Sequence, residues 1–447
     1  MKSTILTGAS ILALAISAPA YAQSTSTIDQ TGADNAAAVD QTGNGNDSEI
    51  VQDGTGLGAD VDQDGDNNLS GILQDSDSVA LGDPSAIVGQ AGNGNESNII
   101  QSSTGSSTGL VTANVDQTGD DNFSGVIQTA TATDGAVDAD VVQANGASSL
   151  VTQANSSAGG GAAATAIVTQ DGFSSSEINQ TLSSGNANGV TANVIQAGDD
   201  HSSLINQAGT GRTQTANVDQ TGVNNASVID QLPGAGGTAS VTQTGTDGTS
   251  TITQDRFSLN ATLNQGGTSN NSDIIQDGPF GSSVTVNQNV VNAGGNNDSF
   301  VQQGPENDGV GISALVNQEG SDNVSTINQD GTNNTLFRNV SADVSQSGDG
   351  NTSDVDQTNP GENVDAEVEQ AGNNNFASIN QAADGVNLQG DNNFADVDQF
   401  GDGNTADIDQ TGTGSNNSAT TLQLGTGSSA TIQQTVDASG DDAFIFQ

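Results

Sequence analysis

Glutamine recurs along this chain at regular intervals, and the interval constrains the fold more than any other feature. One cassette spans Gln41–Gln52 and reads Gln-Thr-Gly-Asn-Gly-Asn-Asp-Ser-Glu-Ile-Val-Gln. The same pattern, Gln-x-Gly-x-x-Asn-x-Ser/Ala-x-Ile/Val-x-Gln, returns at 63–74, 90–101, 117–128, 220–231, 318–329, 346–357, 370–381 and 399–410. A unit this short cannot bury a core alone, so the repeat predicts a structure built by stacking.

The gaps between successive glutamines alternate between a constant class and a variable class. Most gaps of the first class are 11 residues; two are 10, and one, which we assign to Gln288–Gln302, is 14. Gaps of the second class run from 11 to 18 residues, the longest from Gln381 to Gln399. We therefore expect coils with one fixed turn and one loop of variable length, and we count sixteen of them between Gln41 and Gln447.

Inside a cassette, alternate residues share a face, because a β-strand has a period of two. Asn46, Ser48, Ile50 and Gln52 then lie on one face. We expect the aliphatic residues to stack and the amides to form ladders between coils, as in cross-β structures. The glycine at the third position suits a tight turn with positive φ. The pattern predicts an all-β, amyloid-like β-solenoid of strand-turn-strand coils with two facing parallel sheets.

These expectations can be written residue by residue. The predicted stacking ladder comprises Gln41, Asn46, Ile50, Gln52, Gln63, Gln74, Gln90, Asn95, Gln101, Gln117, Asn122, Gln128, Gln370, Asn375, Gln381, Gln399, Asn404 and Gln410. The predicted turn glycines are Gly43, Gly65, Gly92, Gly119, Gly372 and Gly401. Disorder is the alternative for such a low-complexity chain, but a random polar tract would not keep this spacing.

Composition narrows the classes of function. The formal net charge is −50 with only four Lys and Arg residues, which argues against nucleic acid and anionic membranes as partners. The chain has no cysteine, so thiolate chemistry and disulfides are excluded. Aromatic residues make up 3% of the chain, too few for a conventional globular core.

The N-terminal segment has the features of an export signal. Lys2 precedes an apolar stretch, Ile5–Ile16, and Ala20-Tyr21-Ala22 forms a small-x-small cleavage site. An anchoring helix is the alternative, but the apolar stretch is shorter than the ~20 residues that a span needs. We predict a signal peptide at 1–22, a short segment with a partial leading coil at 23–40, and the repeat solenoid at 41–447.

Two features were considered as chemical sites. His201 is the only histidine and stands where the cassette has Asn, next to Asp199 and Asp200. Catalysis would require an activated partner within reach, so a turn substitution is the better interpretation. Acidic turns such as 119–122, 348–351 and 401–404 are rich in the oxygen ligands that Ca²⁺ prefers. Weak calcium binding is therefore a hypothesis beside a purely structural use of these turns, and no other cofactor is expected.

One outward position differs along the chain. The residue before the closing Gln of each cassette is Val51, Leu73, Ile100 and Ile127 in the first four coils. Further along it becomes polar, as Thr152, Asn179, Asn206 and Asp230. An exposed apolar ladder at one end predicts a lateral contact or a nucleating end, and drift at a tolerant position is the alternative.

The cassette resembles the curlin repeat of curli subunits, which form secreted amyloid in bacterial biofilms. Residues 30–41 and 370–381 both fit the pattern Gln-x-Gly-x-x-Asn with a closing Gln. The resemblance implies a β-solenoid, nucleated self-assembly at the cell surface, other curlin subunits as partners and an outer-membrane secretion pore. The chain departs from typical curlins in its many coils and in the short segment between the signal and the first repeat.

The function expected from these observations is structural and not enzymatic. We predict a secreted subunit of curli-like extracellular fibres in a biofilm matrix, which self-assembles by templated stacking of coils and supports surface adhesion. The alternative is a monomeric acidic β-solenoid, either a surface adhesin or a binding protein that uses its variable loops.

Overall fold

The computed structural model describes residues 23–77, 84–104, 109–131, 136–156, 162–183, 188–210, 212–234, 236–277, 281–290, 294–304, 310–330, 338–358, 362–382, 392–412, 416–436 and 440–447. The predicted signal peptide, 1–22, lies outside this range. All regular elements in the described residues are β-strands, and no helix there could cross a membrane.

The strands form two parallel sheets of seventeen strands each. Sheet A contains the odd-numbered strands, β1 (Thr25–Ala33), β3 (Asp47–Thr55), β5 (Leu69–Ser76), β7 (Glu96–Ser103), β9 (Phe123–Ala130), β11 (Ser148–Asn155), β13 (Ser175–Leu182), β15 (Ser202–Gly209), β17 (Ala226–Gln231), β19 (Thr249–Gln254), β21 (Asn271–Gln276), β23 (Asp298–Gln303), β25 (Val324–Asp330), β27 (Thr352–Thr358), β29 (Phe376–Ala382), β31 (Thr405–Gly412) and β33 (Ser429–Val436). Sheet B contains the even-numbered strands, β2 (Ala36–Thr42), β4 (Gly58–Asp64), β6 (Ser85–Ala91), β8 (Val111–Thr118), β10 (Ala136–Ala144), β12 (Ala163–Asp171), β14 (Val190–Asp199), β16 (Gln214–Val223), β18 (Gly236–Gln243), β20 (Phe257–Gln265), β22 (Ser283–Gln288), β24 (Val310–Glu319), β26 (Arg338–Ser347), β28 (Glu362–Ala371), β30 (Phe394–Phe400), β32 (Ser418–Leu424) and β34 (Asp442–Phe446).

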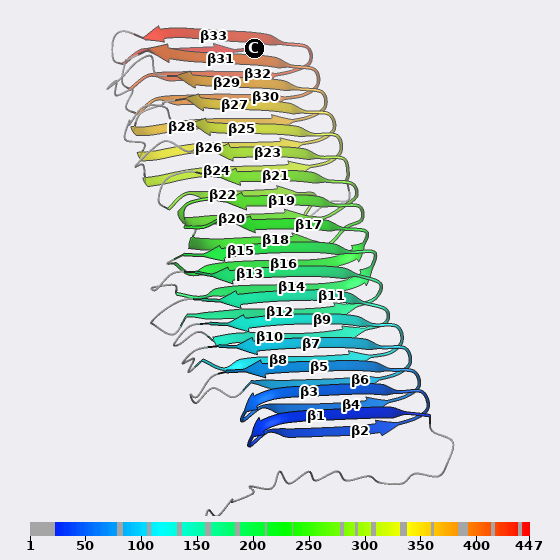
Figure 1. Ribbon diagram of the computed structural model, residues 1–447. Helices are drawn as coiled ribbons and strands as arrows, with labels where there is room; N and C mark the ends of the chain where they lie inside the picture. Colours follow the sequence, from blue (N-terminus) through cyan, green and yellow to red (C-terminus); the bar gives the residue numbers. More distant parts are fainter. Residues whose placement is uncertain are drawn as a thin grey trace, which may run out of the picture.

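Each strand pairs with the strand two places further along the chain, so the polypeptide winds as a β-solenoid (Figure 1). The pairing keeps the glutamines in register, as between Gln52 and Gln74. Sheet A runs from β1 to β33 and sheet B from β2 to β34, and both remain open at the ends. At a strand spacing of ~4.8 Å, sixteen intervals give a rod of about 77 Å. The predicted fold class is confirmed.

The two edges of the rod differ. Connections from sheet B to sheet A are short turns such as 43–46 and 65–68, with one longer exception, 289–297. Connections from sheet A to sheet B range from 56–57 to 383–393. Apart from 289–297, the connections that vary in length therefore join strand ends at one edge of the rod, and the tight turns join strand ends at the other (Figure 1).

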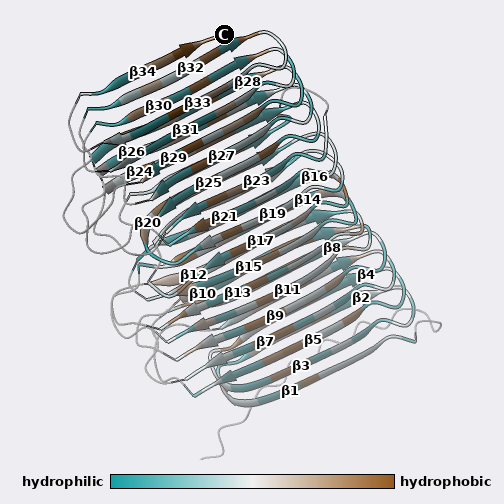
Figure 2. Ribbon diagram, turned by 90° about the horizontal axis from the view of Figure 1, so that it is seen from above, coloured by the Kyte–Doolittle hydropathy of each residue, from teal (hydrophilic) through white to brown (hydrophobic). Residues whose placement is uncertain are grey.

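The core lies between the sheets and consists of stacked aliphatic columns. Burial alternates along most strands, so that Ser70, Ile72 and Gln74 of β5 are buried while their neighbours are more exposed. Ile50 and Ile99 lie in the same column as Ile72 and are fully buried. Figure 2 shows this as brown bands that cross successive strands at the same place. Because each side chain is covered by its copies in the next coils, small residues suffice to build the core.

The structure corrects one detail of the predicted spacing. Gln303, and not Gln302, pairs in register with Gln276 and Gln329. Gln303 is buried, whereas Gln302 lies on the outer face of β23. Two adjacent glutamines made the assignment ambiguous, and the buried Val301 two residues before Gln303 fixes the correct one.

Candidate functional site

Two columns of glutamine amides run the length of the described stack. In sheet B, Gln41 Nε2 donates to Gln63 Oε1 over 2.7 Å, and Gln63 Nε2 donates to Gln90 Oε1 over 2.7 Å. In sheet A, Gln52 Nε2 donates to Gln74 Oε1 over 2.7 Å. The chains of bonds continue to Gln434 and Gln447. They include all the predicted ladder glutamines, namely Gln101, Gln117, Gln128, Gln370, Gln381, Gln399 and Gln410 beside those above.

The second proton of each glutamine amide joins the two sheets. Gln52 Nε2 donates to the Ala36 carbonyl in sheet B over 3.2 Å, and Gln63 Nε2 donates to the Asp47 carbonyl in sheet A over 3.3 Å. Both N–H donors are therefore used although the side chains are fully buried. A buried amide whose partners are complete stabilises the fold, whereas one with a missing partner is costly. The ladders thus tie each coil both to its neighbours and across the core.

A third column, of asparagines, closes the tight turns. Asn46 Nδ2 donates to the Thr42 carbonyl over 2.8 Å, and Asn46 Oδ1 accepts the Asn68 N–H over 3.0 Å. At the predicted position Asn122, Nδ2 donates to the Thr118 carbonyl in the same way. At the predicted positions Asn95, Asn375 and Asn404, Oδ1 again accepts a backbone N–H of the next coil, while Nδ2 donates to the carbonyl of the turn glycine in that coil.

His201 takes the place of an asparagine in this column. Its Nδ1 lies 3.3 Å from the Asn225 N–H, and its Nε2 lies 3.3 Å from the Ala197 carbonyl oxygen. These two contacts correspond to those that Asn46 makes through Oδ1 and Nδ2. The side chain is 1% exposed. The histidine therefore has a structural position and is covered from solvent.

The turn glycines are required by conformation and by space. The φ angles of Gly43, Gly65, Gly92, Gly119, Gly372 and Gly401 range from 82° to 129°. A Cβ on Gly65 would lie 1.9 Å from the Gly92 carbonyl oxygen. The sequence pattern missed a second position of positive φ two residues later, as at Gly45, Asn67 and Asp121. Its strong preference for Gly, Asn and Asp, with Ser269 as an exception, is the signal that could have identified it.

The acidic turns use their carboxylates inside the stack. Asp120 Oδ1 accepts the backbone N–H of Asn93 over 2.9 Å, and Asp66 Oδ1 accepts that of Asn44 over 2.7 Å. Asn93 lies between the two acids and donates from Nδ2 to Asp120. Among the described residues, no group of three or more Asp, Glu or His side chains is arranged to hold a metal ion.

The outer faces of the two sheets carry a column of apolar side chains and a cluster of carboxylates. On sheet A, Val51, Leu73, Ile100 and Ile127 form one column, and Leu73 is 43% exposed. On sheet B, six carboxylates crowd β26, β28 and β30, namely Asp343, Asp365, Glu367, Glu369, Asp396 and Asp398. Burial, followed by the nearby Asp398, Glu367, Glu369 and Asp365, raises the pKa of Asp396 to about 7. The sequence analysis missed this cluster because its members come from three different coils.

The ends of the rod are where the ladders stop. Each glutamine donates toward the C-terminal end, so the amide oxygens of Gln30 and Gln41 begin the two ladders at the N-terminal end. Ile28 of β1 is 44% exposed there, while Ile50 in the next coil is fully buried. The end strands therefore present an uncovered copy of the interface that joins every pair of coils.

Comparison with known families gives the same repeat. A family model described as "Curlin associated repeat" matches residues 24–54, 214–245 and 389–412. These segments cover coils at the start, middle and end of the rod, and each contains ladder glutamines. No curated protein shows significant similarity to the chain. The chain therefore contains the curlin-type repeat in these three segments, and the same ladder arrangement continues through the other described coils.

Proposed function

We propose that this protein is a structural subunit of curli-like extracellular fibres, in which copies add end to end and continue the solenoid. The observation that carries the proposal is that both glutamine ladders reach the two ends of the rod without interruption. An unpaired strand is a template for another chain. At each end of the rod, both terminal strands have one edge without a partner strand, and the two edges face the same way along the rod axis. One added copy would therefore pair with both sheets at once.

The pairing inside the rod predicts the register of the joint. β33 of one copy would pair with β1 of the next, with Gln434 beside Gln30 and Ile432 beside Ile28. β34 would pair with β2, with Gln447 beside Gln41. In the single chain, the amide of Gln434 donates to the backbone carbonyls of Ser418 and Asp441. Glutamines inside the ladder, such as Gln52, donate both to a backbone carbonyl and to the next glutamine. A head-to-tail joint of this kind does not close on itself, so it produces a filament.

The family supports this role. Curlin proteins are structural subunits of extracellular fibres. Export through a signal peptide and an outer-membrane pore, a biofilm matrix and surface adhesion are parts of the proposal. Other curlin subunits are proposed partners because their repeats would offer the same strand edges.

The test is fibre growth of residues 23–447 with an end variant and a matched control. Ile28→Asp places a carboxylate on the inward column of β1, whereas Thr27→Asp adds the same charge to its outer face. We expect Thr27→Asp and the unmodified chain to form fibres that bind thioflavin, and Ile28→Asp to remain monomeric. An unmodified chain that stays monomeric, or an Ile28→Asp chain that grows equally well, would reject the proposal.

A second candidate is a monomeric adhesin or binding protein. It is favoured because nearly all connections of variable length run from sheet A to sheet B, and loops of variable length often carry binding residues. A stable elongated monomer in sedimentation experiments would favour it. Weak Ca²⁺ binding by the acidic turns is a further proposal, and calorimetry that shows only nonspecific screening of charge would reject it.

A further inference from the structure

The outer face of sheet B ends in an exposed apolar surface. Five large side chains lie on its last three strands, namely Phe400, Leu422, Leu424, Phe444 and Phe446, and we call them the C-terminal apolar patch. Phe400 pairs in register with Leu424, and Leu422 pairs with Phe446. Phe444 is 64% exposed and Phe446 is 61% exposed. A contiguous exposed apolar surface of this kind indicates an interaction site.

The proposed end-to-end joint would leave this patch open. A following copy would place Ala38 beside Phe444 and Asp40 beside Phe446, if β2 continues the register of β34. A methyl group and a carboxylate are too small or too polar to cover two aromatic rings that point away from the core. The patch therefore requires an occupant that approaches the side of the rod.

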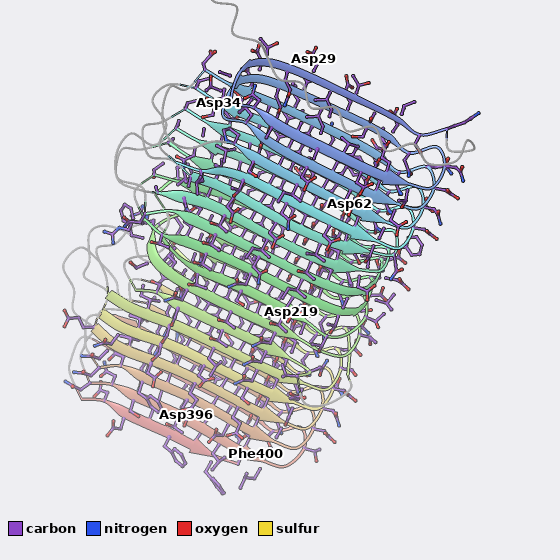
Figure 3. The ribbon with its side chains drawn as sticks, turned by 90° about the horizontal axis from the view of Figure 1, so that it is seen from below. Asp29, Asp34, Asp62, Asp219, Asp396 and Phe400 are labelled. Atoms are coloured by element: carbon purple, nitrogen blue, oxygen red, sulfur yellow. The ribbon has the colours of Figure 1, made fainter. Side chains whose placement is uncertain are left out.

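The charges beside the patch restrict what that occupant can be. Asp398 on β30 pairs in register with Leu422, so the six-carboxylate cluster borders the patch directly (Figure 3). On other strands, some carboxylates accept hydrogen bonds from stacked amides, as Asp356 does from Asn328 and Asp409 from Asn380. In the cluster, Asp343 stacks on Glu367 and Glu367 on Asp396, so acid meets acid.

We propose that the outer face of sheet B at strands β26, β28, β30, β32 and β34 binds a basic, amphipathic polypeptide segment. The cationic side chains of the segment would lie over the carboxylate cluster, and its apolar side chains would lie on the C-terminal apolar patch. Complementary charge selects such a segment, and aromatic anchors supply contact area. A second copy of this chain is a poor occupant because it has four Lys and Arg residues against 54 Asp and Glu. An anionic lipid surface would be repelled by the carboxylates.

The chain offers an internal control for nonspecific attraction to its negative charge. Asp40, Asp60, Asp62 and Asp64 form another acidic group on the outer face of sheet B, at the opposite end. In the three strands there, β2, β4 and β6, Ile87 is the one large apolar residue on the outer face. A polycation should bind both groups, and only an amphipathic one should prefer the C-terminal end.

The experiment measures binding of two synthetic peptides, with equal numbers of lysines, to residues 23–447 at physiological salt. One peptide alternates Lys with Phe and the other Lys with Ser. We expect the Lys-Phe peptide to bind roughly tenfold more tightly, as burial of about one aromatic side chain would give. Phe444→Ser with Phe446→Ser should remove this preference. Asp396→Asn with Asp398→Asn should weaken binding of the Lys-Phe peptide. Asp60→Asn with Asp62→Asn should change the binding of this peptide little.

The proposal would be overturned if both peptides bound equally well, or if the two Asp→Asn pairs weakened binding to the same degree. The carboxylate variants remove repulsion between stacked acids and should fold, so they keep the test valid if the aromatic variants fray the last strand. Because the surface lies on the side of the rod, the measurement can be made on monomers or on fibres. Its failure would leave the fibre proposal untouched.

Discussion

Glu367 on β28 and Asp396 on β30 pair in register on the outer face of sheet B, so two carboxylates stack with one strand spacing between them. Asp343 continues the column on the other side of Glu367. Burial and the surrounding carboxylates raise the pKa of Asp343, Glu367 and Asp398 as well as that of Asp396. At pH values between the pKa of these groups in the unfolded chain and their raised pKa in the folded chain, the folded chain therefore binds more protons here than the unfolded chain.

The first prediction concerns pH. Because the pKa of Asp396 is raised from 3.8 to about 7, the folded state binds more protons than the unfolded state between these values, and stability falls as pH rises through that window. Asp396→Asn should raise the stability of the C-terminal coils at pH 8 by roughly 1–2 kcal/mol, a figure reduced for the screening of a partly exposed group. At pH 3.5 it should have little effect.

Hydrogen exchange of β30–β34 at the two pH values measures this difference. Asp60→Asn, on the outer face of the distant strand β4, is the control for loss of one negative charge and should leave these strands unchanged. Equal stabilisation by Asp396→Asn at pH 8 and pH 3.5 would contradict the account. The same repulsion predicts that fibre assembly quickens with acid or added salt.

The second prediction concerns the glutamine ladder. Gln254→Ala removes the acceptor of Gln231 and the donor to Gln276 inside the core. We expect a loss of about 2–4 kcal/mol, since buried polar groups lose their partners and a cavity forms. Thr253→Ala, on the outer face of the same strand, should change stability by less than about 0.5 kcal/mol. Denaturant unfolding compares the two, and similar midpoints would show that the ladder has no special weight.

The third prediction concerns the tight turns. Gly65→Ala meets a φ of 129° and a carbonyl oxygen 1.9 Å from the added Cβ, so it should cost more than about 2 kcal/mol. At Gly71 in β5 the nearest atom, Asn98 Oδ1, lies 3.5 Å from an added Cβ. Gly71→Ala should therefore be tolerated within about 1 kcal/mol. Thermal unfolding distinguishes the two variants, and equal tolerance would refute the role assigned to the turn glycine.

The fourth prediction concerns the apolar column on sheet A. Ile100→Asp with Ile127→Asp places two charges in the column formed by Val51, Leu73 and these residues. If the column is a lateral contact, fibres of this variant should bundle more slowly while their strands stay as protected as before. Thr152→Asp with Thr253→Asp adds the same charge to the equivalent position of later coils and is the control. Light scattering and electron microscopy follow bundling, and unchanged bundles would assign the column to neutral drift.

The sequence predicted the fold because the information is local and repeated. A period of two within the cassette and nearly constant gaps between glutamines are enough to specify two sheets and their register. Gln302 was assigned wrongly because two adjacent glutamines satisfied the spacing equally well, and only the burial of Val301 separates them.

Other features depend on contacts between coils and were not visible in the spacing. The carboxylate column joins Asp343, Glu367 and Asp396, whose separation in the sequence depends on loops of variable length. His201 stood out by its residue type, yet its asparagine-like contacts with Asn225 and Ala197 emerge only from the stacked backbone. The repeat pattern predicts the features that are the same in every coil, whereas the carboxylate column and His201 depend on residues that differ from coil to coil.

The central claim is that copies of this chain stack end to end as one continuous solenoid. Fibre mass per unit length, measured by scanning transmission electron microscopy, tests it most directly. The seventeen strands of each sheet, at ~4.8 Å per strand, give about 82 Å for each subunit. The chain mass of 44.3 kDa then predicts about 0.5 kDa per Å in a single filament with a 4.8 Å meridional reflection. Filaments with several times that value and no lateral bundling, or a chain that forms only monomers, would contradict the claim.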